Sequence, residues 1–273
     1  MMEIANPFIF LKYGIFQKAI VASLLSGILC SVVGVYVYLR KMTFIGAGLA
    51  HIAFAGISFG LLIGYFPMFW GFIFTLFAAI LVWFFSFRGK LTADSTVGIL
   101  FATSMGLAVL FLGISGKYRS EALSYLFGSP LTTSLIDIFF LFIACVLLLT
   151  LLIYYYRDIY LTIFSEEIAK ASGISTERIT FIATFFISVA VISAMKAVGA
   201  LLVFSLLVVP PAAAYEIAES FTGMIIFSVL FASFSIILGL FLSFLFDVPS
   251  GSMITLVAFV IFVLSYIKKM EGK

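Results

Sequence analysis

The chain has 273 residues, of which 64% are hydrophobic and only 10% are charged, and its formal net charge is +3. An ordinary soluble domain carries about a quarter charged residues, so this composition indicates a protein that crosses a membrane several times. The 15 basic residues are scattered at the ends of apolar segments and form no patch that could bind phosphates. The composition therefore excludes a water-soluble enzyme and a nucleic-acid-binding protein.

Nine apolar segments are long enough to span a bilayer, so we expect an all-α bundle of about nine transmembrane helices that forms one domain over residues 1–273. The segments are 14–39, 46–64, 68–87, 95–114, 134–156, 179–195, 198–216, 222–246 and 251–267. The pair 179–195 and 198–216 is ambiguous, because Gly199, Pro210 and Pro211 could make it a broken or re-entrant hairpin. In that case the chain would have eight spans.

The basic residues predict the orientation of the bundle, because cytoplasmic loops carry an excess of lysine and arginine. With the carboxyl terminus in the cytoplasm and the amino terminus outside, ten of the fifteen basic residues fall on the cytoplasmic side. These ten are Arg40, Lys41, Arg88, Lys90, Arg157, Lys170, Arg178, Lys268, Lys269 and Lys273.

The segment 39–64 contains His51, the only histidine in the sequence. Gly56, Gly60 and Gly64 recur every four residues, a spacing that lets membrane helices approach closely. At about 100° per residue, His51 lies roughly 140° around the helix from Gly56, so the glycines and the histidine use different faces. A polar ring inside a membrane helix is a functional candidate, here a ligand or part of a transport pathway. The alternative is a histidine that only hydrogen-bonds a neighbouring carbonyl.

The segment 157–178, RDIYLTIFSEEIAKASGISTER, is the most polar part of the chain. Ser165 is a plausible N-cap for a short amphipathic helix, with Glu166 and Glu167 in its first turn and Gly173 as its stop. Ile168 and Ala171 would form its apolar side. Such a helix is either a solvated connector or the piece that docks in a partner subunit. The spacing of Glu166–Glu167, Ala169 and Gly173 resembles the E-A-A-x-x-x-G coupling loop of ABC transporter permeases.

The remaining candidate metal ligands are acidic residues near segment ends, where helix caps and interfacial positions are the usual roles. They are Asp94, Asp137, Glu216, Glu219 and Asp247. Asp94 is expected to cap a helix, and Asp247 to lie in a turn. Lys196 is expected to reach the membrane interface from the turn that it occupies.

Five motifs in order resemble the zinc/manganese/iron type of permease from bacterial ABC importers, over nearly the whole chain. The first, LRKMTFIGAGLAHIAFAG at 39–56, resembles the R-R-M-S-x-x-G-D-A-L-S-H-A-x-L-x-G signature of that family. The others are ADSTVGILF at 93–101, YLFGSPL at 125–131, AMKAVGALLVFSLLVVPPAAA at 194–214 and FDVPSGSMI at 246–254.

The resemblance implies a multi-pass permease subunit of an ATP-driven importer in a bacterial or archaeal cytoplasmic membrane. Two copies would pair as a homodimer, a separate ATP-binding-cassette ATPase would dock on 157–178, and an extracytoplasmic metal-binding protein would deliver a divalent ion such as zinc, manganese or iron. The sequence has no G-x-x-x-x-G-K-[ST] motif for ATP. We therefore expect a non-enzymatic transport subunit, in which the metal is a transient cargo and no cofactor is permanently bound.

One departure from the family signature concerns the expected metal site. The signature has an aspartate four residues before its histidine, and here that position is Ala47. An aspartate and a histidine at i and i+4 would share a helix face and could ligate a cation together. Two His51 rings from two copies, without carboxylates, would favour zinc or copper over manganese.

Three alternatives follow from the missing carboxylate and from the general character of the chain. The same architecture could import a metal chelate such as a siderophore or a cobalamin-like molecule. The chain could instead be a secondary transporter that works without an ATPase. A purely structural membrane subunit is the third alternative, and it predicts that His51 and Glu167 both tolerate alanine.

Overall fold

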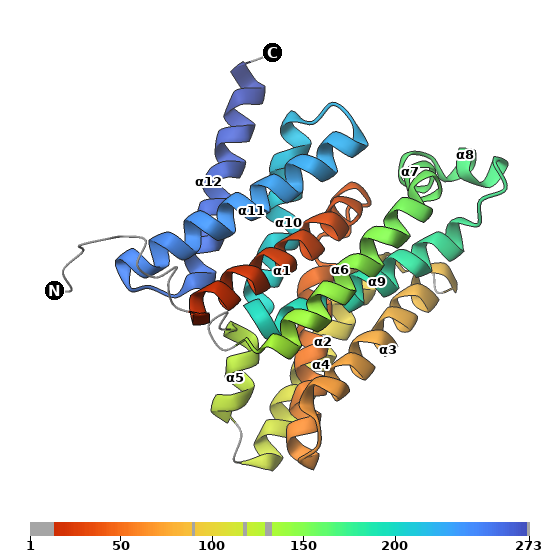
Figure 1. The fold of residues 1–273 in the computed structure, drawn as a ribbon. Helices are drawn as coiled ribbons and strands as arrows, with labels where there is room; N and C mark the ends of the chain where they lie inside the picture. The colour runs from red at the N-terminus through yellow and green to blue at the C-terminus, as the bar shows by residue number, and fades with distance from the viewer. Residues whose placement is uncertain (1–13, 89–90, 117–118, 129–132, 272–273) are drawn as a thin grey trace.

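The computed structural model describes residues 14–88, 91–116, 119–128 and 133–271, and every regular element within these ranges is a helix. Figure 1 shows their arrangement. In chain order the helices are α1 (Gly14–Leu39), α2 (Ile45–Ile63), α3 (Pro67–Arg88), α4 (Ala93–Ser115), α5 (Arg119–Phe127), α6 (Leu135–Tyr154), α7 (Tyr156–Phe164), α8 (Glu166–Ala171), α9 (Thr176–Val198), α10 (Ala200–Ile217), α11 (Phe221–Phe246) and α12 (Ser250–Glu271). The end of the YLFGSPL motif, 129–131, and Lys90 and Lys273 lie outside the described residues.

Nine of the described helices are long and apolar enough to cross a membrane, which confirms the predicted all-α bundle. The uncertain pair is two separate helices, α9 and α10, joined by the single residue Gly199. Gly199 has φ +84°, a conformation that glycine adopts without steric cost. Pro210 and Pro211 lie inside α10 and do not end it, because membrane helices tolerate proline where neighbouring groups satisfy the freed carbonyls.

Three shorter helices lie in the two longest connections. α5 occupies the connection between α4 and α6, and α7 and α8 occupy the connection between α6 and α9. The predicted span 134–156 in fact ends at Tyr154, and α7 begins after the single residue Tyr155. α7 and α8 lie together at one end of the bundle (Figure 1).

Helices α1 and α2 form much of the packed centre. α1 contacts α6, α9, α10 and α11, and α2 contacts α3, α4 and α10. Glycine allows the closest of these approaches: a Cβ atom on Gly34 of α1 would overlap the carbonyl oxygen of Leu207 in α10. Gly56 and Gly60 of α2 lie against the backbone of α3 at Trp70 and Pro67. The predicted glycine face of α2 is therefore a helix-packing face at Gly56 and Gly60, whereas Gly64 is the left-handed C-cap of α2 and has no neighbouring atom near it.

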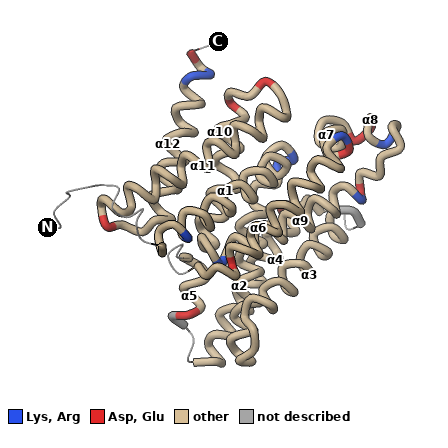
Figure 2. Tube along the Cα trace, in the orientation of Figure 1, with Lys and Arg blue, Asp and Glu red and all other residues tan. Residues whose placement is uncertain are grey.

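Charged residues lie at the ends of the helices and in their connections (Figure 2). Lys196 Nζ is 2.6 Å from Asp137 Oδ1 at one end of the bundle, and Lys269 Nζ is 2.9 Å from Glu216 Oε2 at the other. Asp247 is the left-handed C-cap of α11, as expected for a turn residue. The predicted N-cap at Asp94 is wrong, because the side chain of Thr92 accepts the capping hydrogen bond, from Ser95 N, and Asp94 lies in the first turn.

The close contact at Gly34 predicts that a single methyl group added at this position destabilises the folded bundle. Gly34→Ala should lower the thermal unfolding temperature in detergent, because relieving the overlap with the Leu207 carbonyl must separate α1 from α10, at a cost of about 1–3 kcal/mol. The matched control is Gly251→Ala, whose Cβ would lie an ordinary 3.9 Å from Leu202 Cβ. Equal melting temperatures for the two variants would contradict this account of α1–α10 packing.

Candidate functional site

His51 lies in the second turn of α2, with its ring orientation set by its own helix. Nδ1 is 2.8 Å from the carbonyl oxygen of Ala47, one turn earlier. A carbonyl can only accept a hydrogen bond, so Nδ1 carries the hydrogen and Nε2 of the neutral ring is left with a free lone pair. Histidines that ligate metals are commonly held in this way, with one nitrogen on a backbone carbonyl and the other on the metal.

The His51 ring faces α4 and so points away from the glycine face of α2. It packs edge-on against Phe101, with the ring centroids 4.7 Å apart. Beside Phe101, the exposed face of α4 carries the small residues Gly98, Ala102 and Gly106, and no neighbouring atom lies within 4 Å of a Cβ built at Gly98 or Gly106. The partly exposed imidazole therefore lies at the edge of a face that another helix could approach closely.

No ready-made metal site surrounds His51 in the described part of a single chain. It contains no group of three or more histidine, cysteine, aspartate or glutamate side chains that could hold one. The position one turn before His51 is the methyl group of Ala47. Asp137 and Glu216 pair with lysines at the helix ends. One copy of the chain thus offers one imidazole.

The predicted short helix in 157–178 is present as α8. Ser165 caps it by accepting a hydrogen bond from Ile168 N, and Gly173 follows it with φ +77°. The side chain that α8 buries is Ala169, which is 0% exposed. Ile168 and Ala171, which were expected to form the apolar side of this helix, are not packed on the bundle: Ile168 is 57% exposed and Ala171 is exposed as well.

The two neighbouring glutamates of α8 differ in their surroundings. Glu166 Oε1 accepts a hydrogen bond from Arg40 Nη2 at 2.9 Å, and Glu166 also lies 4.0 Å from Lys170 Nζ. Glu167 is exposed. The Arg40 contact was not predicted from the sequence, because the two residues are 126 positions apart. The basic pair Arg40 and Lys41 before α2 was the only hint of this ion pair in the sequence, and it did not indicate which acidic residue would be the partner.

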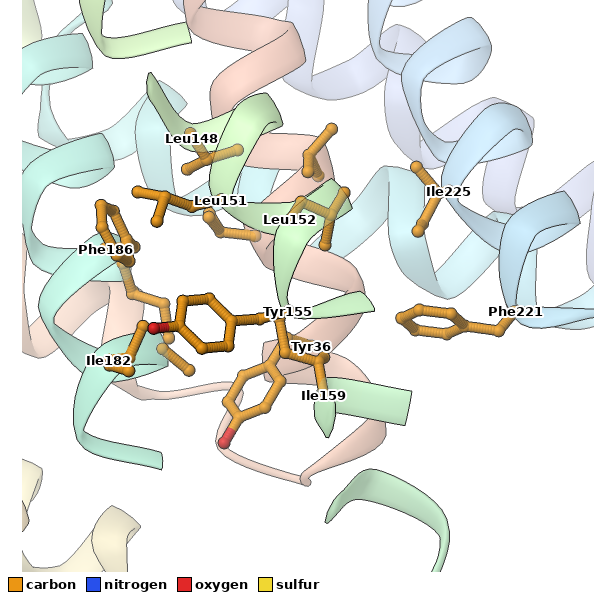
Figure 3. Close-up of a pocket in the computed structure, with 14 residues that line it drawn as sticks. Tyr36, Leu148, Leu151, Leu152, Tyr155, Ile159, Ile182, Phe186, Phe221 and Ile225 are labelled. Atoms are coloured by element: carbon orange, nitrogen blue, oxygen red, sulfur yellow. The ribbon is translucent and has the colours of Figure 1, made fainter. Parts of the chain in front are cut away.

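A cavity lies next to α7 and the residue Tyr155 that precedes it (Figure 3). Its walls come from α1, α6, α7, α9 and α11, with Tyr155 between α6 and α7. Leucine, isoleucine, valine, phenylalanine and tyrosine make up nearly all of the lining, and His51 is not part of it. With no carboxylate, imidazole or thiol on its walls, this cavity is not a metal site.

The sequence from 12 to 269 matches one family over almost the whole chain, the ABC 3 transport family. The chain belongs to this family. The high-affinity zinc uptake system membrane protein ZnuB of Haemophilus influenzae is 30% identical over 251 residues, which are 90% of this chain and 96% of that protein. The manganese transport system membrane protein MntC of Halalkalibacterium halodurans is 31% identical over 258 residues, 94% and 88% of the two chains.

A solved structure has the same fold. The structure of PsaBC from Streptococcus pneumoniae in complex with Fab contains a chain that matches with a TM-score of 0.83 at 27% identity, covering 94% of this chain and 92% of that one. The predicted ABC permease family is thus confirmed, and this ABC 3 protein is a multi-pass permease of the bacterial cytoplasmic membrane. The secondary-transporter alternative does not agree with this family.

The exposure of α8 predicts which of its positions can be reached from water. A cysteine at Glu167 should react rapidly with a membrane-impermeant maleimide, whereas a cysteine at Ala169 should react slowly, because that position is fully buried. The unmodified chain is the control, since Cys30 and Cys145 are both buried. Equal rates for the two variants would show that α8 does not pack as described. Labelling intact cells and inside-out vesicles with the same reagent tests the predicted orientation.

Proposed function

We propose that this ABC 3 permease is the membrane-spanning subunit of an ATP-driven importer of a divalent metal ion, with His51 in the translocation pathway. The observation that carries the proposal is the His51 imidazole, held by the Ala47 carbonyl with Nε2 free, at the edge of an open helix face. An ionisable side chain in a membrane helix is costly, and such groups commonly mark ion pathways. The zinc and manganese transport roles in the names of the relatives support the same cargo class.

The importer needs a second copy of the chain, because one imidazole is a poor site for a cation. The stripe of Gly98, Ala102 and Gly106 on α4, which is exposed at Ala102 and Gly106 and partly exposed at Gly98, offers a surface for that copy. Small residues at this spacing let two helix backbones approach closely. Because the stripe borders Phe101, which contacts His51, a twofold contact here would bring two imidazoles toward one pathway. The homodimer thus completes the metal site.

The energy source is a separate ATP-binding-cassette ATPase that docks on the segment 157–178. The sequence has no ATP-binding G-x-x-x-x-G-K-[ST] motif of its own. On α8 the exposed Glu167 and Ile168 are available to a partner, whereas Ala169 fixes the helix to the bundle and Gly173 ends it. This end of the bundle is then cytoplasmic. An extracytoplasmic metal-binding protein delivers the ion at the opposite end, and closure of the ATPase drives alternating access.

The donor atoms favour zinc among the candidate ions. Imidazole suits zinc and copper, whereas manganese prefers carboxylate oxygens, and Ala47 provides none. The missing carboxylate also supports a second candidate cargo, a metal chelate of the siderophore or cobalamin type, for which the chain would need no direct ligand to the metal.

The first prediction concerns metal uptake. With the permease, its ATPase and its binding protein reconstituted in liposomes, zinc, manganese and iron are compared in assays of uptake and stimulated ATP hydrolysis. His51→Phe keeps an aromatic ring against Phe101 but lacks the lone pair. It should lower uptake of the stimulating ion at least about tenfold, the size of effect that even outer-shell changes produce at metal sites.

The control removes the other polar side chain of α2. Ser58 donates to the Phe54 carbonyl of its own helix, so Ser58→Ala should leave uptake unchanged. Normal uptake by His51→Phe would remove His51 from the pathway. If no free divalent ion stimulated ATP hydrolysis and a metal chelate did, the chelate would replace the metal ion as the proposed cargo.

A second prediction concerns ion selectivity. Ala47→Asp places a carboxylate one turn before His51, on the same helix face. It should raise manganese uptake relative to zinc uptake, because manganese prefers oxygen ligands. Asparagine has nearly the same shape as aspartate but carries no charge, so Ala47→Asn should leave the ratio of manganese to zinc uptake unchanged. An equal effect of both substitutions would mean that position 47 acts through shape and not as a ligand.

A further inference from the structure

Arg40 connects two parts of the permease that are far apart in the sequence. It follows the last residue of α1 in the tight turn to α2, where Lys41 has φ +56° and Met42 N donates to the Val37 carbonyl. Its guanidinium reaches across to the joint between α7 and α8. Nη1 donates to the Thr162 carbonyl at 3.2 Å, and Nη2 donates to Glu166 Oε1 at 2.9 Å.

Each of these contacts satisfies a group that its own helix leaves available. The last four carbonyls of a helix lack intrahelical partners, and Thr162 lies in the last turn of α7. Glu166 is the first residue of α8. One planar guanidinium, with several donors in a fixed geometry, therefore holds the end of one helix and the start of the next. The Arg40 side chain is 20% exposed and that of Glu166 is 44% exposed, so the arginine end of the pair is the more sheltered from water.

Buried hydroxyl groups are placed around the same joint. In the described part of the chain, the hydroxyls of Tyr36, Thr162 and Thr180 are buried, and none makes a hydrogen bond of good geometry. Tyr36 lies one turn before Arg40 on α1, and its hydroxyl lies near Thr180 of α9 and the Arg40 guanidinium. Figure 3 shows this hydroxyl directed away from the leucines of the apolar cavity. A buried hydroxyl without a good partner is costly, so these groups make the joint between α1, α7 and α9 polar although it lies beside an apolar cavity.

Arg40 is also well placed to act on α2. The main packing partners of α8 are α7 and α9, so the Arg40–Glu166 pair gives α8 a direct side-chain link to the turn that leads into α2. His51 lies six residues after the start of α2 at Ile45. A displacement of α8 that carried Arg40 with it would therefore be applied at the end of α2 that is closer to His51.

We propose that Arg40 is a positioning residue that ties α7 and α8 to the turn between α1 and α2, so that displacement of α8 by a partner protein moves α2 and His51. The inference deepens the proposed function and rests on it for its biological use. Without Arg40, the ATPase still docks on the exposed side of α8, but its movement reaches α2 only indirectly, through the packing of α7 and α9 on the rest of the bundle.

The test measures coupling and not uptake alone. In liposomes that contain the permease, its ATPase and its binding protein, Arg40→Gln should lower the number of ions imported per ATP hydrolysed at least about fivefold, the lower end of typical coupling between sites. Co-purification of the ATPase and the hydrolysis rate itself should persist. Lys41→Gln is the matched control: Lys41 is the exposed neighbour in the same turn, and the ratio should stay at the wild-type value.

Charge exchange separates coupling from simple folding. Glu166→Gln should reproduce the Arg40→Gln defect, and the double variant Arg40→Glu with Glu166→Arg should recover most of the ratio. A defect in Arg40→Gln that the exchange leaves unchanged, together with loss of ATPase co-purification, would assign Arg40 a structural role only and overturn the inference.

A second readout does not depend on the identity of the cargo. Spin labels at Ile63, at the far end of α2, and at Phe246, at the end of α11, occupy exposed positions. Binding of ATP to the complex should change the distance between them in the wild type and not in Arg40→Gln. An equal change in both would overturn the inference even where no metal ion is imported, whereas failure of the wild type to import any ion would count against the proposed function alone.

Discussion

The close approach of helix backbones at glycines is the constraint on which the geometry of this permease depends. Lipid tails are as apolar as the helices, so no hydrophobic force drives the helices together and packing must do so. Gly34 brings α1 onto the Leu207 carbonyl, and Gly56 and Gly60 bring α2 onto the backbone of α3. These contacts fix the rotation of α2 about its own axis. His51, on another face of the same helix, is thereby directed at α4 and cannot turn into the packed centre.

The same lack of water explains how the bundle treats its polar side chains. Many described serine and threonine hydroxyls in the spans donate to a carbonyl of their own helix, as Ser26, Ser58 and Ser188 do. Such residues add polarity without forming a pathway. His51 also bonds its own helix, but a histidine has a second nitrogen, so the bond to Ala47 orients the ring and leaves Nε2 available. The buried groups around Arg40 differ again, because they bond across helices or lack a partner.

The parts of this structure that were predictable from the sequence are those set by bilayer thickness and helix periodicity. The length of apolar runs identified the nine spans, and the 100° repeat separated His51 from the glycine face. The break at Tyr155 was not predictable, since neither glycine nor proline occurs at that point. The burial of Ala169 in α8 was not predictable either, because a helix of six residues is too short to show a periodic pattern. The pairing of Arg40 with Glu166 depends on tertiary structure, which no local pattern encodes.

The absence of a carboxylate at position 47 is compatible with transport because a permease must release what it binds. Conduction requires a site that binds the ion strongly enough for it to enter and weakly enough for it to leave. A cage of imidazoles and carboxylates would hold a divalent cation tightly, whereas two imidazoles at a twofold contact bind it less tightly and lose part of that site when the helices separate. Selection among ions can then take place mainly in the delivering protein. In the proposed homodimer, His51 would act as a ligand only while α2 and α4 of the two copies are close, and the helix movement proposed for the ATPase would release the ion.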